Sequence, residues 1–95
     1  MGLMTAPSHP GEILKHEFLE PLGVSAIGLA RAIGVPRTRI ERLVKEQTAV
    51  TPDTALRLSK ALGTTAEFWI NLQANFDMAA ARKTVDVSDI RPLVA

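Results

Sequence analysis

Residues 26–45 constrain the fold more than any other segment, because small, turn-forming and apolar residues recur there at the spacing of two short crossed helices. Ser25 is a suitable N-cap for the first helix, and Ala30 is small where the two helices must approach closely. Gly34 lies at the turn between them, where a positive φ is expected. The apolar side chains that would then point inward are Val35, Ile40 and Leu43. The spacing predicts a helix-turn-helix whose second helix, the recognition helix, runs from about residue 36 to residue 45.

The outward face of the recognition helix is basic. Residues 31–45 contain five basic side chains and one acid, Glu41, which gives a net charge of +4 (five minus one) in a chain whose formal net charge is +1. The five are Arg31, Arg37, Arg39, Arg42 and Lys45. Cations clustered on one helix are typical of a surface that binds nucleic-acid phosphates in or beside the major groove. The alternative interpretation is an ordinary helical hairpin whose basic face is merely solvated.

Start and stop signals predict three further helices, and so a five-helix, all-α fold. The first begins at Pro10 and ends at residues 21–23, with apolar side chains on one side. Another follows the N-cap Thr51 and stops before Gly63. The last begins at a capping box and continues to residue 82 or 83. The capping box is formed by Thr64 and Glu67.

The pattern predicts one domain, residues 9–83, preceded by a flexible N-terminal arm, residues 1–8. It is followed by a short extended C-terminal tail, residues 84–95, in which β-favouring residues alternate with acids. These β-favouring residues are Val85, Val87 and Ile90. A lone strand is unstable, so the tail is expected to need a partner strand or groove, as in a dimer contact.

The last helix has too much apolar surface for one stripe. Phe68, Trp69 and Ile70 are consecutive and therefore about 100° apart around the helix axis, so they cannot all face one core. Two interpretations remain open. Either this is a central helix wrapped by its own domain, or one side is shared with a second copy or another partner.

Composition excludes several kinds of site. The 95 residues include no cysteine, which removes disulfides, thiolate metal sites and cysteine nucleophiles. His9 and His16 lie near three glutamates, but no H-E-x-x-H spacing occurs, and a surface-exposed first helix explains them. No apolar run has membrane-spanning length, and the first residues lack a signal-peptide pattern. We therefore expect a soluble, cytoplasmic protein that is not an enzyme and needs no cofactor or metal.

Four blocks of sequence together resemble a known family. They are HPGEIL (9–14), EFLEPLG (17–23), TPDTALRL (51–58) and EFWINLQ (67–73). In this combination, over about residues 7–83, the chain resembles the HigA/VapI antitoxins, a branch of the Xre-type repressors. The resemblance implies a five-helix repressor-like domain, a homodimer, and binding of double-stranded operator DNA upstream of its own operon. It also implies neutralisation of a HigB-like ribonuclease toxin, for which spacing and charge give no evidence.

The chain departs from the repressor pattern at the start of the recognition helix. Repressors of the wider group usually have Ser or Thr at this N-cap, whereas Pro36 has no side-chain acceptor, so the helix start is expected to shift by a residue. By the resemblance, the base-contacting candidates are Arg37, Thr38 and Arg42, and the phosphate-contacting candidates are Arg39 and Lys45. A stand-alone Xre-type transcriptional repressor without a toxin partner, and a protein-interaction module, are the alternatives.

Overall fold

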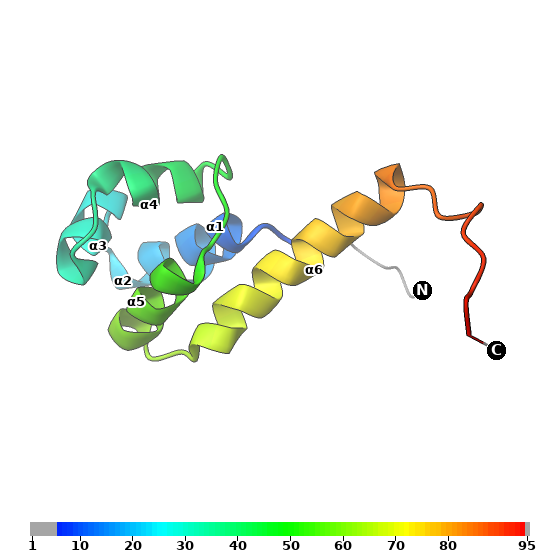
Figure 1. Cartoon of the computed structure of the whole chain (residues 1–95). Helices are drawn as coiled ribbons and strands as arrows, with labels where there is room; N and C mark the ends of the chain where they lie inside the picture. Colours follow the sequence, from blue (N-terminus) through cyan, green and yellow to red (C-terminus); the bar gives the residue numbers. More distant parts are fainter. Residues whose placement is uncertain (1–5, 95) are drawn as a thin grey trace.

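The computed structural model describes residues 6–94, and all regular secondary structure within them is helical (Figure 1). The first helical segment consists of α1 (Pro10–Ile13), a π-helical stretch η1 (Leu14–Leu19) and α2 (Glu20–Leu22), which follow one another without a break. The later helices are α3 (Ala26–Ile33), α4 (Arg37–Val44), α5 (Pro52–Leu62) and α6 (Ala66–Thr84). The predicted all-α class with five helical segments is confirmed.

The helices form a small body from which α6 projects. In Figure 1, α3 and α4 lie at one end, and α6 begins beside α5 and runs diagonally past α1. Its C-terminal half extends beyond the other helices. The helix-turn-helix and the free end of α6 are therefore at opposite ends of the described part of the molecule.

One core joins all five helical segments. Its largest fully buried apolar side chains are Leu14, Ile40, Leu43, Leu58 and Trp69, and α3 adds Leu29 and Ala30. The Trp69 indole N–H donates a hydrogen bond to Thr64 Oγ1 at 2.7 Å, so its one polar group is satisfied. The EFWINLQ block thus supplies a central core residue.

The predicted capping box at the start of α6 is wrong by one residue. Thr65, rather than Thr64, is the N-cap, and its hydroxyl oxygen accepts a hydrogen bond from the Phe68 N–H at 3.0 Å. Glu67 therefore lies one position too early in the helix for a capping box. Two adjacent threonines made both starts plausible, and the Thr64 hydroxyl oxygen accepts from the Trp69 indole N–H instead of capping the helix.

His9 is buried, which corrects the prediction of a surface-exposed helix around both histidines. Only 5% of its surface is exposed, and its ring packs edge-to-face on Phe76 of α6 with centroids 4.9 Å apart. Its Nδ1 accepts a hydrogen bond from the Gly11 N–H at 2.9 Å and so caps α1. His16 lies on the exposed side, where it pairs with Glu20 at 3.0 Å.

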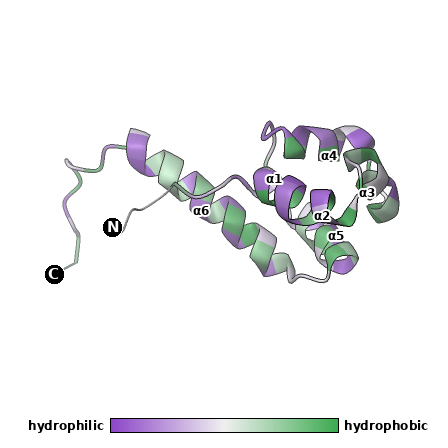
Figure 2. Cartoon of the chain, turned by 180° about the vertical axis from the view of Figure 1, so that it is seen from behind, coloured by the Kyte–Doolittle hydropathy of each residue, from purple (hydrophilic) through white to green (hydrophobic). Residues whose placement is uncertain are grey.

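The three consecutive apolar residues of α6 face different surroundings, as their spacing predicts. Trp69 is fully buried, Ile70 is half-buried, and Phe68 is 37% exposed. Apolar and polar residues are mixed along the projecting part of α6, seen from behind in Figure 2. Some apolar surface of this helix is thus left uncovered by the body of the chain.

The tail forms no strand between residues 85 and 94, and its side chains there are exposed. The tail is irregular rather than continuously extended, because the Ile90 N–H donates to the Val87 carbonyl at 3.0 Å in a turn, and the partner that the tail was expected to need stays a prediction. Of the predicted arm, residues 1–5 lie outside the described residues, while Ala6 and Pro7 are exposed and irregular. Within the described residues, no helix combines the length and the apolar character needed to span a membrane.

Candidate nucleic-acid interface

The helix-turn-helix forms as predicted, from local caps and one close crossing. Ser25 Oγ accepts a hydrogen bond from the Gly28 N–H at 2.9 Å and caps α3. Gly34 ends α3 with a φ of 73°, a left-handed conformation that favours glycine. Ala30 is buried where α3 meets α4, and its carbonyl accepts from the Val35 N–H at 3.0 Å. The turn therefore sets the angle at which α4 leaves α3.

Pro36 is the N-cap of α4, so the expected shift of the helix start does not occur. Its backbone is extended, with φ −60° and ψ 141°, and its side chain makes no cap hydrogen bond. The Pro36 carbonyl instead accepts from the Arg39 N–H at 3.0 Å. A pre-set φ near −65° suits this position even without a capping oxygen.

The two sides of α4 differ in burial and in charge. Ile40 and Leu43 are buried in the core, while the five predicted site residues lie exposed. These are Arg37, Thr38, Arg39, Arg42 and Lys45. Arg37 Nε lies 4.0 Å from Glu41 Oε1 on the same helix, at a surface where such pairs contribute little. Within residues 6–94, Arg42 and Lys45 have no carboxylate within ion-pair distance.

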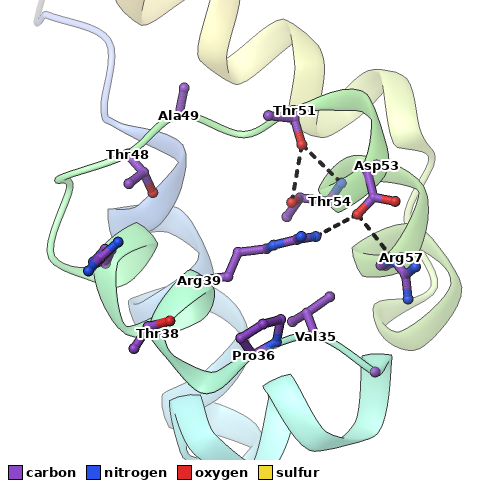
Figure 3. A pocket seen from close by; sticks show the side chains of 12 residues that line it. Val35, Pro36, Thr38, Arg39, Thr48, Ala49, Thr51, Asp53, Thr54 and Arg57 are labelled. Carbon is purple, nitrogen blue, oxygen red and sulfur yellow. Dashed lines mark hydrogen bonds and ion pairs between the residues drawn. The ribbon is translucent and has the colours of Figure 1, made fainter.

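Arg39 differs from the other cations of α4 because it is bonded to a carboxylate on another helix. Its Nη1 donates to Asp53 Oδ2 of α5 at 2.5 Å, and the same oxygen accepts from Arg57 Nε at 3.1 Å (Figure 3). Arg57 Nη1 also donates to the carbonyl oxygen of Ile33, the last residue of α3, at 2.8 Å. The hydrogen bond from Arg39, followed by the nearby Arg57, holds the pKa of Asp53 below its ordinary value of 3.8.

A groove of about 500 Å³ lies beside these residues, between α4 and the start of α5. Thr38, Arg39 and Arg42 line it from α4, and Thr48 and Ala49 line it from the loop that follows (Figure 3). Sequence reasoning missed Thr48, Asp53 and Arg57. The spacing of Asp53 and Arg57, four residues apart on one helix, was the available signal for the last two.

The loop that carries Thr48 and Ala49 is fixed at both ends. At its start, the Glu46 and Gln47 N–H groups donate to the Leu43 and Arg42 carbonyls, each at 2.9 Å, and Glu46 has a φ of 62°. At its end, the buried Gln73 accepts from the Val50 N–H at 2.8 Å. The glutamine of the EFWINLQ block therefore ties this wall of the groove to α6.

The described residues hold no cluster of three His, Cys, Asp or Glu side chains suited to a metal ion. What they bring together is an exposed basic helix, a groove beside it that is lined by both polar and apolar residues, and buried core residues on the other side of the helix. Such a surface can bind an anionic polymer through phosphate contacts and present arginine forks to base edges.

Comparison with known proteins identifies the family to which this chain belongs. The helix-turn-helix family matches residues 16–69. Virulence-associated protein I of Dichelobacter nodosus is 47% identical over 75 residues, which cover 79% of this chain and 69% of that protein. The structure of antitoxin GraA in complex with its operator has a TM-score of 0.88 at 42% identity, covering 100% of this chain and 99% of that chain. Pseudomonas aeruginosa antitoxin HigA with the higBA promoter has a TM-score of 0.83 at 39% identity, covering 93% of this chain and 99% of that chain. This chain therefore belongs to the helix-turn-helix family, in the HigA/VapI antitoxin branch of the Xre-type repressors.

Proposed function

We propose that this chain is a sequence-specific DNA-binding antitoxin that represses its own operon and neutralises a HigB-like ribonuclease toxin. The observation that carries the proposal is the division of α4 between a buried side, Ile40 and Leu43, and an exposed basic side. Relatives that share this fold over nearly their whole length were solved with an operator or a promoter, which supports DNA as the ligand.

Within that function the exposed side chains of α4 have two roles. Arg37, Thr38 and Arg42 contact base edges, because an arginine fork can donate to the O6 and N7 atoms of guanine together. Arg39 and Lys45 contact phosphates and fix the register of the helix on the duplex. The protein acts by binding, in the cytoplasm where its operon is transcribed, and catalyses no reaction.

The toxin and a second copy of the chain would use other surfaces. The projecting part of α6 and the tail expose apolar side chains, among them Met78, Val85 and Ile90, far from the outward face of α4. A homodimer would cover part of this surface, and the toxin would dock on the remainder or on the first helical segment. DNA binding and toxin binding are therefore separable by mutation.

Co-expression with the product of the neighbouring gene tests this. The chain should relieve the growth arrest that the neighbour causes and should co-purify with it. Arg37→Ala and Arg42→Ala should abolish repression of a reporter driven by the upstream DNA, yet preserve rescue. Lys60→Ala, which removes an exposed cation from α5, is the matched control and should leave both intact. A harmless neighbour would favour the stand-alone repressor, and joint loss of rescue and repression in folded variants would contradict separate surfaces.

A further inference from the structure

Asp53 links the recognition helix to the two helices that flank it. Through one oxygen it accepts from Arg39 of α4 and from Arg57 of its own helix, and Arg57 in turn donates to the last carbonyl of α3. The Asp53 carboxylate is therefore held by Arg57, which is itself bonded to α3, as well as by its bond with Arg39. Figure 3 shows the Arg39 side chain extended across the groove toward Asp53.

The bond to Asp53 uses only part of the hydrogen-bonding capacity of Arg39. A guanidinium has five N–H donors, and the Arg39 side chain is 41% exposed, so donors remain for a second acceptor. The cluster of Arg39, Asp53 and Arg57 has two cations and one anion, which leaves it with a net charge of +1 (two minus one). It also opens on the groove lined by Thr38 and Arg42. A phosphate oxygen is an acceptor that this arrangement suits.

We propose that Asp53 is a positioning residue for DNA binding: it holds the Arg39 guanidinium at the groove between α4 and α5, ready to donate to a DNA phosphate. The inference rests on the proposed function. A free arginine loses rotamer freedom when DNA orders it, whereas Arg39 has already lost much of that freedom to Asp53. Loss of this preorganisation should weaken binding by about two- to tenfold in Kd.

The sign of the effect separates positioning from simple electrostatics. Asp53 is an anion beside a surface that binds a polyanion, so its removal should strengthen DNA binding if only net charge matters. Positioning predicts the opposite, namely weaker binding although a negative charge has been lost. The effect should also need Arg39, because Asp53 acts through that side chain.

The test is a fluorescence-anisotropy titration of the full chain against a labelled duplex from the DNA upstream of its gene, at several salt concentrations. Asp53→Ala should weaken binding by about two- to tenfold, and Asp53→Glu should restore most of the affinity. Arg39→Ala should weaken binding and lower the slope of log K against log salt by about one. The double variant should bind no more weakly than Arg39→Ala alone.

Glu67→Ala is the matched control. Glu67 also lies exposed in the first turn of a helix, and within residues 6–94 it has no ion pair. It should bind like the unchanged chain, and thermal melts should show all variants folded, since exposed ion pairs contribute little to stability. Equal or tighter binding by Asp53→Ala overturns the positioning role, as does a further loss in the Arg39→Ala background. Failure of the unchanged chain to bind the duplex overturns the proposed function and this inference with it.

Discussion

A Cβ atom placed on Gly11 would lie 1.8 Å from the carbonyl oxygen of Leu43, so the start of α1 rests directly on the last turn of the recognition helix. The glycine of the HPGEIL block is therefore required by close packing rather than by an unusual φ. Because the obstacle is backbone of α4, it cannot move aside as a flexible side chain could. This contact joins α1 to the last turn of α4.

Gly11→Ala should lower the free energy of unfolding by about 3 kcal/mol, the upper end of the range for overpacked cores. Gly23→Ala is the control, because Gly23 has a φ of 67° and open space around it. That control should lose only about 1 kcal/mol, from the left-handed backbone alone. Urea unfolding followed by circular dichroism measures both values. Equal losses would contradict the packing role of Gly11.

Glu46→Gly should raise the free energy of unfolding by about 0.5 to 1 kcal/mol. Glu46 is an exposed residue held at a φ of 62° after α4, a conformation that glycine adopts without the Cβ penalty. Gln47→Gly in the same loop should instead lower stability by about 0.4 to 1 kcal/mol, because its φ is not positive and glycine only adds freedom to the unfolded chain. The same urea titration distinguishes the two signs, and destabilisation by Glu46→Gly would show that the side chain matters.

The cluster of Arg39, Asp53 and Arg57 should contribute to the free energy of unfolding at neutral pH and lose that contribution in acid. The hydrogen bond from Arg39 lowers the pKa of Asp53 in the folded chain, so its ionised form stabilises the fold above the ordinary value of 3.8. That contribution is lost as the pH falls through the lower, folded-state pKa. The difference in unfolding free energy between the unchanged chain and Asp53→Asn should thus be constant near neutral pH and shrink in acid. Asp86, whose pKa is lowered by hydrogen bonds from Ser88, cancels in this difference. A difference that grows in acid would contradict the pairing.

The chain should be a dimer in solution. The exposed apolar residues of α6 and the tail exceed what one small body covers, and operators read by such proteins have two half-sites about 34 Å apart. Light scattering of the full chain at micromolar concentration should give twice the mass of 10.3 kDa. Truncation after residue 83 should shift the equilibrium toward the monomer. A monomeric full chain would refute this prediction.

Apart from the exact starts of α4 and α6, local signals in the sequence predicted the helices and the turn correctly, because caps and left-handed glycines act within a few residues. Ser25, Gly34 and Thr51 lie where they were predicted, and each works through its own backbone neighbourhood. Long-range packing was not predictable in this way. The burial of His9 depends on Phe76 in the last helix, and Arg39 reaches Asp53 on another helix, 14 residues away. The sequence therefore placed Arg39 correctly on the exposed face of its helix, but it did not predict the bond to Asp53.

The central claim, that the exposed side of α4 recognises operator DNA, is tested most directly by one titration. The full chain is bound to the duplex upstream of its gene, and to a scrambled duplex of equal length, over a range of salt concentrations. We predict tighter binding to the upstream duplex and a steep loss of affinity as salt rises. Arg42→Ala should lose about 1 to 3 kcal/mol on the upstream duplex and relax preference at one base position, while Lys45→Ala should weaken binding to both duplexes alike. Binding whose affinity is the same for the two duplexes and unchanged by salt would contradict this claim. Identical losses from Arg42→Ala and Lys45→Ala on both duplexes would contradict it as well.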